Sequence, residues 1–113
     1  MMFSQMLASV LALTASTQIR DGVSTAQDAF TSCLNQFADR SVQSRKAEAA
    51  FTTELATQCM DQERAYRAAM IRRDVASRIS QAEAESSANE EVIYARQQAH
   101  DSFTDARPAR SPS

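Results

Sequence analysis

The feature that most constrains this chain is a long stretch without glycine or proline. The 113-residue chain has one glycine, Gly22, and both of its prolines, Pro108 and Pro112, lie in the last six residues. Residues 23–107 therefore lack the two residue types that most often interrupt helices and shape tight turns. Such a stretch favours long helices and disfavours a sheet of short strands.

Two apolar stripes of helical period lie within this stretch, and each contains one of the two cysteines. The first stripe contains Val23, Ala26, Phe30, Cys33, Leu34 and Phe37. The second stripe contains Phe51, Leu55, Cys59, Tyr66 and Met70. Steps of three and four residues place each stripe on one face of a helix. The polar residues 39–44 separate the stripes and are the predicted turn.

The positions of the cysteines predict how the two helices pair. In one unbroken helix Cys33 and Cys59 would lie about 39 Å apart, too far for a disulfide. Folding the chain about Lys46 places the cysteines opposite each other and brings Phe37 opposite Leu55. We therefore predict a Cys33–Cys59 disulfide within an antiparallel hairpin. The alternatives are two reduced core cysteines and an interchain bridge.

The second helix is predicted to begin near Ser44 and to be long. Its later apolar residues lie about 180° from the stripe that contains Cys59. These later residues are Ile71, Val75, Ile79 and Ala82. Ser87 and Glu90 form a capping box, which predicts a break and a short third helix. In that case the third helix covers the second face with Val92, Ile93 and Phe103; otherwise the helix runs on with an exposed seam.

The predicted fold class is thus all-α, a disulfide-stapled antiparallel helical hairpin with a long second helix and a short third helix. The helices would pack side by side in the manner of a coiled coil. Gly22 marks the predicted break before the first helix, and Ser24 with Gln27 forms its predicted capping box. Residues 22–105 are the predicted helical unit. Residues 106–113 are the predicted disordered tail, because they lack the apolar content needed for a core.

The first residues resemble an export signal. Residues 6–15 form an apolar run of about 15 Å as a helix, which is half of a bilayer. Small residues follow, which is typical of a cleavage site, although the first five residues lack the usual lysine or arginine. We predict a cleaved signal peptide over residues 1–16, against the alternative of a plain amphipathic helix. The mature protein would then be periplasmic or secreted, without stable membrane insertion, in a compartment where disulfides persist.

Residues 29–70 resemble a group of small exported helical proteins. In those proteins an aromatic residue precedes a first cysteine, an alanine-rich helix leads to a second cysteine, and an acidic residue follows. Phe30, Cys33, Cys59 and Glu63 stand in those places here. The segment is similar to two-cysteine helical proteins of unknown function from alphaproteobacteria. That resemblance implies the fold and the compartment, and it implies no catalytic residues.

The sequence contains no recognisable catalytic or metal-binding constellation. His100 is the only histidine, so the three or four converging ligands of a zinc or copper site are not available from histidines. Cys59 lies near Asp61 and Glu63, which is not the electropositive setting of a reactive thiolate. A single glycine excludes a glycine-rich phosphate loop. We therefore expect no enzymatic activity, no metal and no cofactor.

The second helix also carries a cluster of positive charge. The residues of this arginine patch are Arg64, Arg67, Arg72, Arg73 and Arg78. They form either a solvated face of ion pairs or a surface that grips an anionic partner. The formal net charge of −2 argues against generic nucleic-acid binding.

Two functional hypotheses remain at this point. The first is a structural or protein-interaction module whose second apolar face binds another copy or another envelope protein. The residues of that face are Ile71, Val75, Ile79 and Ile93. The alternative is a small envelope enzyme or inhibitor that acts through the arginine patch or His100.

Overall fold

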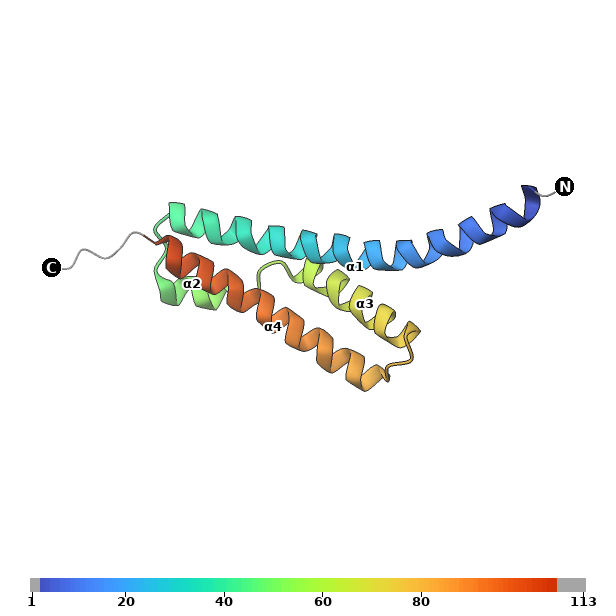
Figure 1. Ribbon diagram of the computed structural model, residues 1–113. Helices are drawn as coiled ribbons and strands as arrows, with labels where there is room; N and C mark the ends of the chain where they lie inside the picture. The colour runs from blue at the N-terminus through green and yellow to red at the C-terminus, as the bar shows by residue number, and fades with distance from the viewer. Residues whose placement is uncertain (1–2, 108–113) are drawn as a thin grey trace.

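The computed structural model describes the backbone of residues 3–107 and the side chains of residues 22–107. Within this part of the chain every regular element is an α-helix, which confirms the all-α prediction (Figure 1). The helices are α1 (Phe3–Gln43), α2 (Glu48–Leu55), α3 (Met60–Ala76) and α4 (Gln81–Ala106). Across the described residues no helix combines the length and the hydropathy that crossing a membrane requires.

Helices α1, α3 and α4 pack against one another as a three-helix bundle (Figure 1). The chain reverses between α1 and α3 and again between α3 and α4, so α4 runs parallel to α1. The short α2 lies against the C-terminal half of α4, where Phe51 stacks on Phe103 with ring centroids 3.9 Å apart. The predicted antiparallel hairpin is therefore formed by α1 and α3, and α2 lies beside it.

The predicted stripes supply the core. Phe30, Leu34 and Phe37 of α1 are buried, as are Tyr66 and Met70 of α3. Helix α4 adds a mostly small apolar face to this core. Its buried residues are Ala84, Ala88, Val92, Ala99 and Phe103. Small side chains on α4 let the three helix axes come close together, while the aromatic residues fill the end of the bundle.

Helix α1 differs from the prediction at both of its predicted boundaries, the break at Gly22 and the turn at residues 39–44. The helix runs through Gly22 without a break, and it continues past the predicted turn to Gln43. Ser41 is buried, and its hydroxyl donates a hydrogen bond to the carbonyl oxygen of Phe37 at 2.8 Å. The helix can therefore bury this polar residue without an unpaired group. The turn follows instead at residues 44–47, where the amide of Lys46 donates to the carbonyl of Ser41 at 2.9 Å.

The prediction of one long second helix is wrong, because two connections interrupt it. The first connection covers residues 56–59 and the second covers residues 77–80. The last helix begins at Gln81, so the predicted break near Ser87 is also misplaced. Ser80 is the N-cap, and its hydroxyl accepts a hydrogen bond from the amide of Glu83 at 3.2 Å. Ser87 lies inside α4.

The two ends of the chain are described only in part. The predicted signal segment, residues 1–16, belongs from Phe3 onward to α1, whose N-terminal part extends past the ends of α3 and α4 (Figure 1). Of the predicted tail, Ala106 ends α4 and Arg107 is its C-cap. Residues 108–113 lie outside the described residues, as do residues 1–2.

Candidate functional site

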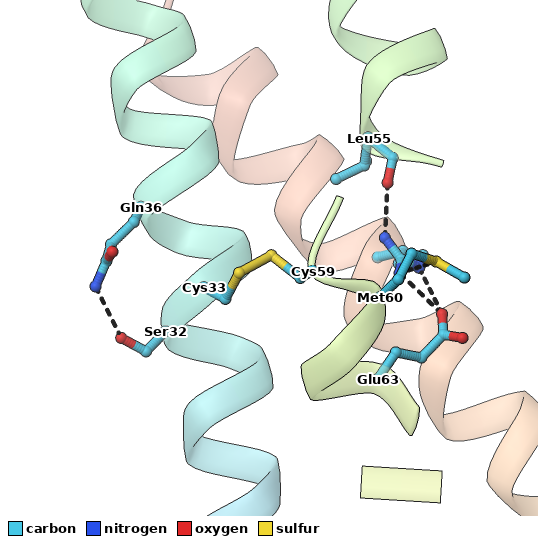
Figure 2. Close-up of a disulfide and its surroundings, with 8 residues drawn as sticks. Ser32, Cys33, Gln36, Leu55, Cys59, Met60 and Glu63 are labelled. Carbon is cyan, nitrogen blue, oxygen red and sulfur yellow. Dashed lines mark hydrogen bonds and ion pairs between the residues drawn. A yellow bond between two sulfur atoms is a disulfide. The ribbon is translucent and has the colours of Figure 1, made fainter. Parts of the chain in front are cut away.

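The predicted disulfide is present and joins α1 to the start of α3 (Figure 2). The sulfur atoms of Cys33 and Cys59 are 2.05 Å apart, and their Cα atoms are 6.0 Å apart. One turn before Cys33 on α1, Phe30 meets Tyr66 of α3 with ring centroids 5.9 Å apart. The cysteine pairing and the antiparallel direction deduced from the sequence are both confirmed.

Cys59 has an unusual backbone conformation. Its φ and ψ of 62° and 33° are left-handed, and it occupies the N-cap position of α3 without a side-chain cap. For a residue with a Cβ atom this conformation costs roughly 1–2 kcal/mol. The carbonyl of Cys59 accepts the amide of Glu63 at 2.9 Å, so α3 starts directly from this residue. The disulfide therefore anchors the point at which the chain changes direction.

Arg96 of α4 reaches both sides of the connection between α2 and α3. Its guanidinium donates to the carbonyl oxygen of Leu55 at 2.6 Å and to Oε1 of Glu63 at 2.8 and 3.0 Å (Figure 2). It also lies 5.3 Å from the ring centroid of Phe30. The side chains of Arg96 and Glu63 are only 14% and 13% exposed, so this ion pair is largely shielded from water.

The surroundings of Glu63 keep it ionised. Burial alone would raise the pKa of this carboxyl. The hydrogen bonds and positive charges of Arg96 and Arg67 lower the pKa, and together they outweigh the effect of burial. The net result is a pKa below the usual value for glutamate. Arg67 donates to Oε2 of Glu63 at 3.2 Å and to Oδ1 of Asn89 on α4 at 3.1 Å. Glu63 is thus the centre of a polar cluster that joins α3 to α4.

Sequence reasoning missed this cluster. Arg96 and Glu63 are 33 positions apart, and no periodic or motif rule connects them. The one local indication was that Arg96 is the only cation in the second half of α4. A single charged residue on a helix is usually solvated, so that indication is weak.

The arginine patch does not converge on one point. Three of its members form ion pairs within α3: Arg64 with Asp61 at 2.8 Å, Arg67 with Glu63, and Arg73 with Asp74 at 3.1 Å. Arg72 and Arg73 point to other sides of α3 than Arg64, because each residue turns the helix by about 100°. Arg78 lies in the connection after α3 with a φ of 68°. Ion pairs within α3 thus engage three of the five arginines of the patch.

His100 lies at the contact between α4 and α2. Its Nε2 is 3.5 Å from Oε1 of Glu48, its Nδ1 is 3.8 Å from Asp101, and its ring is 6.2 Å from that of Phe51. Among the described side chains, no three histidine, cysteine or acidic residues are arranged to hold a metal ion. The contacts of His100 are those of a residue that joins two helices.

A groove of about 330 Å³ is lined by residues of α1, α3 and α4. Polar and apolar side chains line it, among them Gln27 and Leu34 of α1, Tyr66 of α3, and Glu91 and Tyr94 of α4. Burial raises the pKa of the Tyr66 hydroxyl, and the charge of Glu91 acts in the same direction while Arg73 opposes it. Tyr66 is therefore neutral and serves as a packing residue with a polar edge.

The predicted interaction face is divided by the structure. Ile71 is half-buried and packs against the core, whereas Val75, Ile79 and Ile93 are 43%, 37% and 55% exposed. The third helix does not cover this face in the predicted way. Val92 and Phe103 enter the core, and Ile93, which is 100° further round α4, faces outward. Met60, which the helical period also places on the second face, is 41% exposed, and Tyr94, which the prediction did not include, is 60% exposed.

Comparison of the chain with protein-family models, with curated proteins and with solved structures found no match.

Proposed function

We propose that the protein is an exported helical module that works by structural assembly or by binding another protein. The observation that carries this proposal is an asymmetry in exposed apolar surface. Among the described side chains, every large apolar one with high exposure lies on α3, on α4 or on the connection between them. These residues are Met60, Val75, Ile79, Ile93 and Tyr94. In the described parts of α1 and α2, the large apolar side chains are buried or half-buried.

Most of these side chains belong to one side of the bundle, the α3/α4 face. We define this face by its apolar residues Met60, Ile71, Val75, Ile79 and Ile93. Met60 and Ile93 flank Arg96, since Sδ of Met60 is 3.8 Å from its guanidinium and Ile93 lies one turn before it. Val75 and Ile79 lie at the other end of α3.

Burial of this face would stabilise a complex. Transfer of apolar surface from water contributes about 25 cal/mol for each Å² that is covered. The face also includes Arg64 with an exposed ion pair, which gives it the mixed apolar and charged composition of a protein interface. Another copy or another envelope protein would gain most by covering both ends of α3.

Two features support export as part of this proposal. Disulfides persist in the periplasm and outside the cell, and Cys33 and Cys59 are joined. The second feature is the length of α1. Val23 and Met70 line the same cavity, and Ala76 ends α3 six residues after Met70. Because α1 and α3 are antiparallel, the end of α3 lies beside the residue six positions before Val23, which is Thr17. The segment that we propose is removed, residues 1–16, is therefore the part of α1 that extends past the bundle.

The test compares Val75→Asp with Ala76→Asp in the mature, oxidised protein. Both residues are exposed in the last turn of α3, but Ala76 lies about 100° away from Val75. Light scattering should show that the mass of the wild type rises with concentration. Val75→Asp should abolish that rise without loss of helicity, and Ala76→Asp should retain it.

A photo-reactive side chain placed in living cells extends the test to a different partner. We expect position 93 to form a specific cross-link, to itself or to one other protein, and position 98, which is exposed and lies about 140° further round α4, to form none. If the mass stays constant and the two positions behave alike, the α3/α4 face is ordinary surface and the proposal fails.

A further inference from the structure

The break between α2 and α3 has no obvious cause in the sequence. Residues 56–59 are Ala, Thr, Gln and Cys, with neither glycine nor proline among them. In a continuous helix Phe51, Leu55 and Cys59 would share one face with Tyr66 and Met70. In the folded protein Phe51, Leu55, Tyr66 and Met70 are all buried in a single core. The same residues could therefore be buried by one unbroken helix over residues 48–76.

Two contacts are made at the break. The first is the disulfide, which fixes Cys59 to α1 while Cys59 is in its left-handed conformation. The second is Arg96. In a continuous helix the carbonyl of Leu55 would accept the amide of Cys59. That carbonyl instead accepts the guanidinium of Arg96 at 2.6 Å and the amide of Gln58 at 3.3 Å.

We propose that the Cys33–Cys59 disulfide is a redox-sensitive switch that keeps α2 and α3 apart. When it is reduced, residues 56–59 become helical, and α2 joins α3 in one helix. Cys59 then leaves its left-handed conformation, and its amide replaces Arg96 at the carbonyl of Leu55. Arg96 keeps its ion pair with Glu63.

The reductant is a dithiol of the thioredoxin-like class. One of its thiolates attacks a sulfur of the disulfide, forms a mixed disulfide and releases the other cysteine as a thiolate. Its second thiol attacks the mixed disulfide and releases the remaining cysteine. Two electrons and two protons pass to Cys33 and Cys59, and the reductant ends as a disulfide. Neither cysteine residue is fully buried in the oxidised protein.

The switch would move α2 along α1. In the oxidised protein Phe37 stacks on Phe51 with ring centroids 5.2 Å apart. In a hairpin of two unbroken helices, Phe37 lies four residues after Cys33 and Leu55 lies four residues before Cys59. Phe37 would therefore lie opposite Leu55. The two partners differ by four residues, so α2 would shift by about 6 Å, roughly one helical turn. Phe51 would then leave its place beside Phe103 and His100.

The test is nuclear magnetic resonance of the isotope-labelled mature protein before and after reduction with dithiothreitol. We expect the Cα shifts of residues 56–59 to change from non-helical to helical values while α1, α3 and α4 stay folded. The ring signals of His100, the only histidine, should move because Phe51 departs. Two results would overturn the proposal: reduced protein that keeps the break, or reduced protein that unfolds as a whole.

Variants separate the disulfide from the reagent. Cys33→Ala should show the helical shifts at residues 56–59 without reductant. Ser32→Ala, one position away on the exposed side of α1, should show them only after reduction. If Cys33→Ala fails to fold, the reduced wild type decides the question. The readout is independent of self-association, so it can fail while the proposed docking face stands.

Discussion

At the scale of single residues, Arg96 determines how the connection between α2 and α3 is held. Its planar guanidinium offers several donors in fixed directions, which allows one side chain to bond a carbonyl and a carboxylate at once. Leu55 ends α2 and Glu63 lies in the first turn of α3, so these bonds join two helix ends to α4. A lysine could place its charge there but could not reproduce the fork.

Arg96→Ala should lower the free energy of unfolding by about 2–4 kcal/mol, because it leaves Glu63 and the Leu55 carbonyl without their donor. Urea denaturation followed by circular dichroism measures this loss. Arg96→Lys serves as the matched control and should lose less than Arg96→Ala but remain below the wild type. An Arg96→Ala protein within 0.5 kcal/mol of the wild type, about the spread of ordinary surface substitutions, would contradict this role.

Glu63 should make stability depend on pH in the acid range. Its pKa in the folded protein is lower than the usual value of 4.5, so its contribution is fully present above that value. The contribution is lost as the pH falls through the folded pKa. The wild type should therefore exceed Glu63→Gln in stability near neutral pH, and the difference should shrink below about pH 4.5.

Urea denaturation at a series of pH values measures this difference. The Arg96→Ala background provides the control, because one of the cations that lower the pKa of Glu63 is then gone. The Glu63→Gln substitution should have a smaller and less pH-dependent effect in that background. Equal effects in both backgrounds would show that Arg96 does not act on Glu63.

At the scale of helices, the stripes were predictable and the connections were not. Apolar residues at steps of three and four identified the buried faces of α1 and α3, because packing imposes that period directly. The connections contain Arg45, Cys59 and Arg78, one in each, all with positive φ. Glycine and asparagine are the residues that usually mark this conformation. Tertiary contacts impose it here on residues that carry no such signal.

The start of α4 illustrates a second limit. Ser87 with Glu90 predicted the start of the third helix, but Ser80 with Glu83 has the same spacing, which the prediction did not use. Only Ser80 acts as a cap, because a helix that starts there buries Ala84 and Ala88 in the core. The sequence predicted that a third helix exists. Packing against the core determines which of the two Ser-x-x-Glu patterns begins it.

Ser80→Ala should therefore cost about 1 kcal/mol, which is typical for the loss of an N-cap. Ser87→Ala is the matched control. It should leave stability unchanged or raise it slightly, since alanine is the better helix former inside a helix. Urea denaturation compares the two variants. A larger loss for Ser87→Ala would place the start of α4 where the sequence alone had put it.

At the scale of the whole molecule, the disulfide is the element that sequence reasoning located best. Two cysteines on two stripes leave one antiparallel register in which they meet, so the pairing followed from geometry. The Arg96–Glu63 pair could not be found in this way, because its partners lie on helices whose relative rotation the sequence does not specify. The chain between the cysteines closes a loop that should contribute about 3.5 kcal/mol in the chain-entropy model.

The length of α1 leads to a prediction for the exported protein. Mass spectrometry of protein recovered from the envelope or the medium should find an N-terminus between Ala15 and Gln18. Such a mature chain should also be two hydrogens lighter than its reduced form, because Cys33 and Cys59 are joined. Protein that retains Met1 in that fraction would contradict the signal-peptide prediction.

The stapled loop also affects how the molecule would respond to tension. The first and last described residues lie at opposite ends of the bundle (Figure 1). A force applied along the chain enters through α1 and passes directly to α3 through the Cys33–Cys59 bond, so α2 bears no load. The cysteines are 26 positions apart, and that segment amounts to about 90 Å of extended chain. When fully extended, an oxidised molecule would thus be about 90 Å shorter than a reduced one. It would act as a tether whose length depends on its redox state.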